Sequence, residues 1–76
     1  MFDTGYTATH KGKTYQVKHG DPFDRGSADS YYGRPAHPHK YPNGTGNAPR
    51  VDALTPTERL EYFAGYEYNE ESGDKK

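Results

Sequence analysis

The sequence predicts a small α+β domain in which a β-hairpin is followed by two helices joined by a long loop. Two observations predict this class. A segment of alternating apolar and polar residues is interrupted by Lys11-Gly12 near the N-terminus, and helix-start signals precede residues 22 and 56. The chain has 76 residues, a length typical of one domain. We therefore expect residues 1–76 to form a single small domain.

Residues 5–19, GYTATHKGKTYQVKH, have the pattern of a hairpin. With Lys11-Gly12 as a two-residue turn, one register gives one apolar face and one polar face. The expected cross-strand pairs are Tyr6–Val17 and Ala8–Tyr15 on the apolar face and Thr7–Gln16 and Thr9–Thr14 on the other. Because Lys-Gly is not the most favourable turn pair, a bulge at Gly12 is an alternative.

Residues 21–34, DPFDRGSADSYYGR, are predicted to form the first helix. Asp21 is placed as the N-cap, a proline follows at the first helical position, and Gly33 is placed to end the helix. Gly26 costs about 1 kcal/mol relative to alanine inside a helix. We therefore expect another element to approach closely there. The expected apolar stripe is Phe23, Ser27, Ala28 and Tyr31.

Residues 35–54 form a long connection that contains four prolines and an Asn43-Gly44 turn signal. The TPTE sequence at 55–58 is a capping box and predicts a helix over residues 55–72, followed by a frayed tail at 73–76. The expected core stripe of this helix is Leu60, Phe63 and Ala64, widened by Tyr62 and Tyr66. Gly65 is expected to admit a neighbouring backbone.

The apolar supply is thin, with two leucines, two valines and neither isoleucine nor tryptophan. A net charge of −1 and eight tyrosines nevertheless favour a folded chain, because each tyrosine ring can bury about 150–250 Å². We expect tyrosine to supply most of the core. The expected core tyrosines are Tyr6, Tyr15, Tyr31, Tyr62 and Tyr66.

Composition also bears on the function class. The chain has no cysteine, so disulfides, thiolate nucleophiles and Cys-type zinc sites are excluded. The sequence shows neither an apolar run long enough to span a membrane nor a signal-peptide pattern. No nucleophile elbow, HExxH helix or phosphate-binding loop is present. We therefore expect a non-enzymatic protein without catalytic residues, cofactors or metal ions.

His37-Pro38-His39 is the one candidate for a metal pair. A site needs three or four ligands, and no other residue has supporting spacing. We interpret these residues as solvated loop histidines.

The candidate functional residues lie at the end of the first predicted helix and in the long loop that follows it. They are Tyr32, Arg34, His37, His39, Lys40 and Tyr41. Aromatic anchors beside basic residues are typical of a partner-binding surface. The same residues could stack the bases of single-stranded RNA. The structural alternative is that Tyr41 folds under the loop and pins it.

Charge is unevenly distributed. Residues 10–19 contain three lysines, two histidines and no acid, whereas residues 58–74 are strongly acidic. These segments are either ordinary solvated faces or, for the acidic helix, a surface for a basic partner.

GSADSYYGR, PHKYPNGT and ERLEYFAGYEYN together resemble small uncharacterised proteins of tailed bacteriophages, over residues 22–76. More distantly, the layout is similar to ribosome modulation factor, with Gly33-Arg34, 38–41 and 63–66 in the corresponding places. Ribosome modulation factor is strongly basic, as an rRNA binder must be, whereas this chain has a net charge of −1.

These observations lead to a hypothesis: a phage accessory protein in the cytoplasm of the infected host that binds a host protein or complex and modulates it by occlusion. Candidate targets are a host enzyme, the transcription machinery or a defence complex. An RNA- or ribosome-binding modulator is the alternative that the second resemblance implies. A minor virion component is a third, and self-association is compatible with each.

Overall fold

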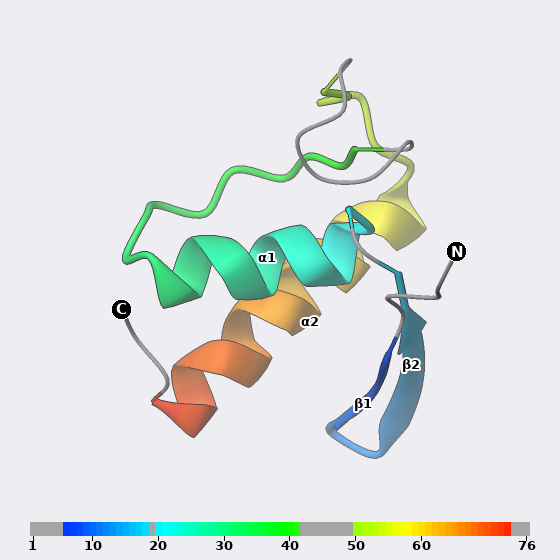
Figure 1. The fold of residues 1–76 in the computed structure, drawn as a ribbon. Coiled ribbons are helices and arrows are strands. Elements are labelled where there is room, and N and C mark those ends of the chain that lie inside the picture. Colours follow the sequence, from blue (N-terminus) through cyan, green and yellow to red (C-terminus); the bar gives the residue numbers. More distant parts are fainter. Residues whose placement is uncertain (1–5, 19, 42–49, 74–76) are drawn as a thin grey trace, which may run out of the picture.

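The computed structural model describes residues 6–18, 20–41 and 50–73 (Figure 1). The element order is β1 (Tyr6–His10), β2 (Lys13–Val17), α1 (Pro22–Tyr31) and α2 (Pro56–Ser72). The chain is therefore α+β, with an antiparallel hairpin followed by two packed helices, as predicted. The predicted turn at Asn43-Gly44 and residues 74–76 of the predicted tail lie outside the described residues.

The hairpin has the predicted register, since Tyr6 pairs with Val17 and Ala8 pairs with Tyr15. Lys11 and Gly12 have φ values of 52° and 78°, the left-handed pair of a type I′ turn. The two-residue turn thus forms, and the alternative of a bulge does not. Glycine suits the second position because a left-handed φ costs it nothing.

Helix α1 is shorter than predicted. Asp21 is its N-cap residue, but the carboxylate accepts from the backbone N–H of Lys18 at 2.8 Å instead of capping the helix. At the other end, Gly33 has φ 71° and donates to the carbonyl of Ser30, and Arg34 N–H donates to the carbonyl of Asp29. This Schellman-type ending stops the helix before Gly33 and turns the chain back.

Helix α2 begins and ends as predicted. The Thr55 hydroxyl accepts from Glu58 N–H at 3.1 Å, and the Glu58 carboxylate accepts from Thr55 N–H at 2.9 Å. Gly73 ends the helix with φ 70°. Among the described residues, no helix combines the length and apolar character that crossing a bilayer requires.

The two helices meet backbone to backbone at two glycines. A Cβ atom on Gly26 would lie 1.9 Å from the Tyr62 carbonyl oxygen, and one on Gly65 would lie 2.0 Å from the Phe23 carbonyl oxygen. Real carbon and oxygen atoms do not approach so closely, so neither site accepts a side chain. The predicted close approach at both glycines is confirmed.

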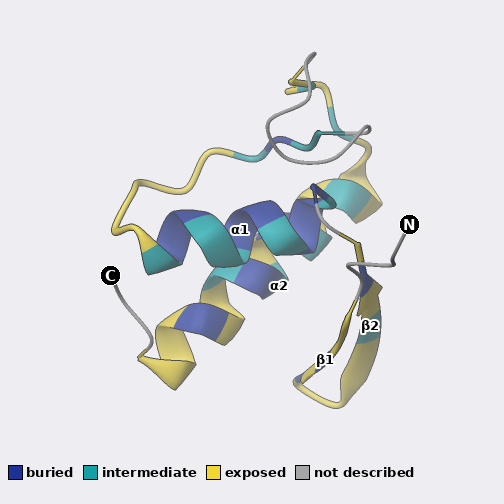
Figure 2. Cartoon of the chain, in the orientation of Figure 1, coloured by how far each residue is buried: buried dark blue, intermediate teal, exposed yellow. Residues whose placement is uncertain are grey.

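The predicted core stripe of α2 is wrong for Leu60 and Phe63, which are 71% and 40% exposed. The buried residues of α2 are Tyr62, Gly65 and Asn69. A helix turns about 100° per residue, so putting Gly65 at the centre of the contact directs positions 60 and 63 away from α1. Figure 2 shows the buried stripe of α2 against a largely exposed remainder.

The apolar core lies where the hairpin meets α1 and consists of Ala8, Val17 and Phe23, flanked by Tyr15 and Ala64. The Tyr15 and Phe23 rings are 4.8 Å apart. Of the predicted core tyrosines, Tyr62 is fully buried, whereas Tyr6 is 41% exposed. The other three, Tyr15, Tyr31 and Tyr66, are half-buried.

The basic end of the hairpin pairs with the acidic helix of the same chain. His10 Nε2 lies 3.3 Å from Glu67 Oε1, and Lys11 Nζ lies 3.1 Å from the same oxygen. The hydrogen bonds from Lys11 and His10 hold the pKa of the Glu67 carboxyl below its usual value. Part of the charge asymmetry in the sequence is therefore an internal docking contact.

Candidate binding pocket

The segment after α1 turns back and runs along this helix towards its first turn (Figure 1). Its beginning is held by the Tyr66 hydroxyl, which donates to the Arg34 carbonyl at 2.6 Å. Its end is held by Tyr41 N–H, which donates to the Gly20 carbonyl at 2.8 Å. Lys40 also forms an antiparallel bridge with Val51, which brings Arg50 beside α1.

A pocket of about 340 Å³ lies between α1 and this returning segment. Its volume falls at the small end of the range for ligand pockets. The described residues that line it are Arg25, Asp29, Arg34, Pro35, His37, His39, Tyr41 and Arg50. Three arginines thus surround one pocket, although the chain as a whole has a net charge of −1.

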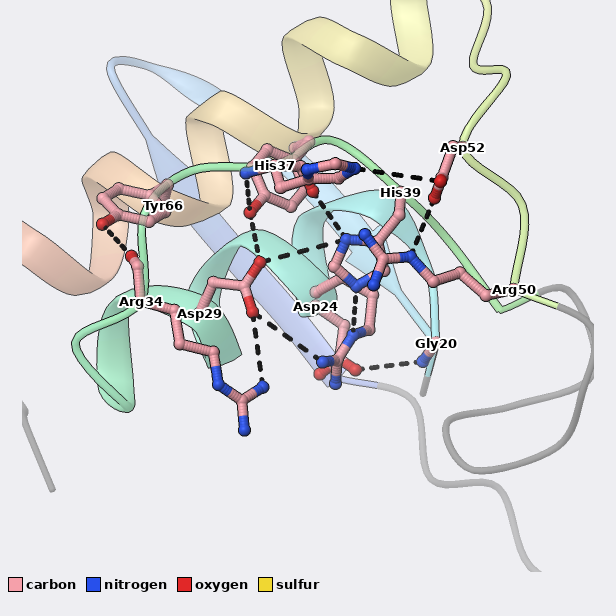
Figure 3. Close-up of polar contacts among 11 residues, drawn as sticks. Gly20, Asp24, Asp29, Arg34, His37, His39, Arg50, Asp52 and Tyr66 are labelled. Atoms are coloured by element: carbon pink, nitrogen blue, oxygen red, sulfur yellow. Dashed lines mark hydrogen bonds and ion pairs between the residues drawn. The ribbon is translucent and has the colours of Figure 1, made fainter.

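Asp29 lies at the centre of the polar network and is only 4% exposed. Its Oδ2 accepts a hydrogen bond from the Tyr62 hydroxyl, which in turn accepts from His37 N–H at 2.9 Å. Its Oδ1 lies 3.7 Å from Arg34 Nη1 and 3.9 Å from Arg25 Nη2. Figure 3 shows these contacts converging on the carboxylate. A buried carboxylate needs such hydrogen bonds and opposite charges, because they replace its lost contacts with water.

His39 is 3% exposed, and its hydrogen bonds define its protonation state. Arg25 Nε–H can only donate, so His39 Nε2 must accept at 3.0 Å. The proton is then on Nδ1, which donates to the His37 carbonyl at 2.6 Å. Burial lowers the pKa of the His39 imidazole, and the nearby Arg50 charge adds to this although the bond to His37 opposes it. The ring is therefore neutral.

Tyr62 is anchored in the same network. Burial raises the pKa of its hydroxyl, and the hydrogen bond to Asp29 raises it further. The phenol stays protonated and acts as a donor to Asp29. Its ring also packs beside His39, with centroids 5.7 Å apart, so α2 supports the floor of the pocket.

The three arginines are held differently. The Arg25 guanidinium is buried and lies 5.3 Å from the centre of the Tyr41 ring, within cation–π range. The Arg34 side chain is 57% exposed and stacks over Tyr32 at 4.9 Å. Arg50, at the far wall, donates from Nε to Asp52 at 2.8 Å.

Contacts of Asp52 with Arg50 and with His37 connect Arg50 to the returning segment. The Arg50 hydrogen bond holds the pKa of the Asp52 carboxyl below its usual value. The second Asp52 oxygen lies 3.8 Å from His37 Nε2 (Figure 3). Asp29 and Asp52 thus offset part of the positive charge of the three guanidiniums.

The structure places the six predicted site residues unequally. Arg34, His37, His39 and Tyr41 line the pocket. Tyr32 is 49% exposed and stacks under Arg34 outside the lining. Lys40 does not line the pocket, because its ammonium pairs with the Glu58 carboxylate on α2 and the pKa of Glu58 is lowered as a result.

The interpretation of His39 as a solvated loop histidine is wrong, because its side chain is buried. Both its ring nitrogens are engaged, so it positions Arg25 rather than contacting a partner. Tyr41 matches the structural alternative, since it is half-buried, ties the segment to Gly20 and packs its ring edge-on to His39 at 5.6 Å.

Sequence reasoning missed Arg25, Asp29 and Arg50. The first two are four residues apart on one helix, a spacing that puts them on the same face. This spacing was the available signal. For Arg50 the sequence offered none, because its place depends on the Lys40–Val51 bridge.

Within residues 6–18, 20–41 and 50–73, no group of three or more His, Cys, Asp or Glu side chains is placed to hold a metal ion. The His37 and His39 rings are 6.3 Å apart at their centroids. The arrangement is suited to binding an anion through guanidinium groups.

Comparisons of the chain with protein-family models, with curated proteins and with solved structures found no match.

Proposed function

We propose that this protein is a non-enzymatic phage accessory protein that binds a host protein in the cytoplasm of the infected bacterium and modulates it by occlusion. The binding surface is the pocket and its rim: Tyr32, Arg34, His37, Tyr41 and Arg50. The observation that carries the proposal is the convergence of three arginines on one pocket in a chain with a net charge of −1. The resemblance to small phage proteins supports the viral setting.

The composition of the rim suits protein recognition. Tyrosine and arginine are enriched among residues that dominate binding energy at protein interfaces. Tyr32 is 49% exposed, and Arg34 lies over its ring. The stacking holds both side chains in one geometry, which reduces the entropy that binding would otherwise cost.

The charge distribution favours a protein partner over RNA. Proteins that bind single strands use an extended basic groove that follows the backbone. Here three of the four arginines line one pocket, and the fourth, Arg59, lies apart from it on α2. The Lys40 ammonium forms an ion pair with Glu58, and the Lys11 ammonium forms one with Glu67. The lysines that would extend a basic track are thus partly neutralised.

Occlusion requires only a stable complex, and the scaffold suits that task. The pocket is supported by a closed network of buried groups, namely Asp29, His39 and Tyr62. Pre-formed networks of this kind keep a surface in its binding geometry.

The test is affinity purification of the tagged protein from bacterial lysate, with and without nuclease, followed by mass spectrometry. We expect one stoichiometric protein that survives nuclease and is lost with Arg34→Glu. Arg59→Glu is the matched control, because Arg59 is an exposed arginine on α2 that does not line the pocket.

Two results would contradict the proposal. Ribosomal proteins that disappear with nuclease would establish the RNA-binding alternative. Recovery of the chain from purified phage particles, with no captured host protein, would make it a virion component.

A further inference from the structure

The charge balance of the pocket indicates which group it accepts. Three guanidiniums and one carboxylate, that of Asp29, line the pocket. Asp52 lies outside the lining and is hydrogen-bonded to one of the three, Arg50. His39 is neutral, because its Nε2 accepts from Arg25. One net positive charge therefore remains when Asp52 is counted with its partner Arg50 and His37 is neutral.

Two arginines combine solvent exposure with terminal nitrogens that have no hydrogen bond within the described residues. Arg25 uses Nε on His39 and lies against the Tyr41 ring. Arg34 is 3.7 Å from Asp29, which is longer than a hydrogen bond. Arg50 donates from Nε to Asp52, and its terminal nitrogens have no hydrogen bond to the part of the chain that the structure describes. The exposed fractions of these two side chains, 57% and 41%, leave both reachable from solvent.

The walls of the pocket are partly apolar. Pro35 and the Tyr41 ring line it together with the charged groups. A ligand that fits must combine an anionic head with apolar atoms next to it. A planar guanidinium matches the two oxygens of a carboxylate, and a peptide side chain supplies the apolar stem.

We propose that the pocket binds a single carboxylate from the partner protein, presented by an acidic side chain or by a chain end. This rests on the proposed function and specifies its ligand. One negative charge cancels the one net positive charge of the pocket. A dianionic phosphate would leave an uncompensated negative charge near Asp29 and Asp52, which repel it. The charge balance thus favours a carboxylate over a phosphate.

The experiment is an NMR titration of the ¹⁵N-labelled full chain, following the arginine Nε–H signals. The probes are four short peptides: acetyl-Ala-Glu-Ala-amide, its glutamine counterpart, its phosphoserine counterpart, and acetyl-Ala-Ala-Ala with a free C-terminus. We expect a carboxylate peptide to shift the Arg34 and Arg50 signals in a saturable manner. The glutamine peptide should bind at least about tenfold more weakly, because it loses charge-assisted hydrogen bonds.

The two carboxylate peptides distinguish the source. Tighter binding of the glutamate peptide assigns the pocket to an acidic side chain, and tighter binding of the free C-terminus assigns it to a chain end. Equal binding of the glutamine peptide, stronger binding of the phosphoserine peptide, or no shift with any peptide would overturn the inference.

Three variants test whether the peptide binds in the pocket. Arg34→Gln and Arg50→Gln should each weaken binding by about tenfold, whereas Arg59→Gln should leave it unchanged. An unchanged pattern of backbone amide signals shows that each variant is folded. Unchanged affinity in both pocket variants would overturn the inference.

The two experiments can contradict one proposal without contradicting the other. A host protein captured in an Arg34-dependent manner, with no peptide binding, would overturn only the carboxylate assignment. Peptide binding without any captured host protein would overturn only the proposed function.

Discussion

Helix α1 contacts two neighbours in different ways. Towards the hairpin it presents Phe23, which packs with Ala8 and Val17 in an ordinary apolar cluster. Towards α2 it presents Gly26, Asp29 and Ser30, so this contact combines a backbone-to-backbone approach with buried hydrogen bonds.

The difference shows how a chain with few aliphatic residues forms a core. Apolar packing tolerates small changes of shape because side chains can readjust. The α1–α2 contact has less freedom, since its backbones are already touching and its polar groups are buried. A buried polar group that loses its partner pays the full desolvation cost. We therefore expect the α1–α2 contact to be the more sensitive to substitution.

The largest effect is expected for Gly65→Ala. In an exposed helix this change stabilises by about 1 kcal/mol, but here the new methyl group meets the Phe23 carbonyl oxygen at 2.0 Å. The sign should reverse, with a loss of about 3 kcal/mol or more. Chemical denaturation followed by circular dichroism measures this. Ser27→Ala on α1 is the control, and a stable Gly65→Ala protein would refute the close packing.

Tyr62→Phe should have the next largest effect. It removes the hydroxyl that donates to Asp29 and accepts from His37 N–H. A loss of about 2–3 kcal/mol is expected, because a buried carboxylate loses a partner. Tyr66→Phe is the matched control, since it deletes one bond to the Arg34 carbonyl at a more exposed site. It should cost about 0.5–1.5 kcal/mol. Equal losses in the two variants would contradict the special role of the buried network.

A pH effect is expected from His39. Its pKa is lowered by burial in the folded state, whereas it is about 6.5 in an unfolded chain. Below pH 6.5 the unfolded chain takes up a proton that the folded state resists. Stability should therefore fall as the pH is lowered from 6.5 to the folded pKa, by up to about 1.4 kcal/mol per pH unit.

Denaturation curves between pH 7.5 and 4.5 measure this slope. His39→Gln should flatten it, because this substitution removes the buried imidazole whose pKa is lowered on folding. If His39→Gln keeps the full slope, the neutral buried imidazole is not its source.

The smallest effect is expected for Leu60→Ala. Leu60 is 71% exposed on the side of α2 away from the glycine contact. The free energy of unfolding should change by no more than about 0.5 kcal/mol. A loss above about 2 kcal/mol for Leu60→Ala would restore the core stripe that the sequence predicted.

The sequence by itself determined the local elements, because their causes are local. The register of the hairpin follows from alternation around Lys11-Gly12, and the start of α2 follows from the Thr55 and Glu58 capping box. Helix ends at Gly33 and Gly73 follow from the left-handed conformation that glycine adopts readily. Gly26 and Gly65, inside the two predicted helices, also indicated that another backbone approaches closely, although the sequence did not say which one.

Only the tertiary structure decided which side of α2 is buried and where the pocket lies. Hydrophobic periodicity favoured Leu60, but the space at Gly65 and the bond between Tyr62 and Asp29 turned the helix the other way. Arg50 reaches the pocket through a bridge between distant residues. Such placements depend on contacts between segments far apart in the chain, and a pattern within one segment does not contain them.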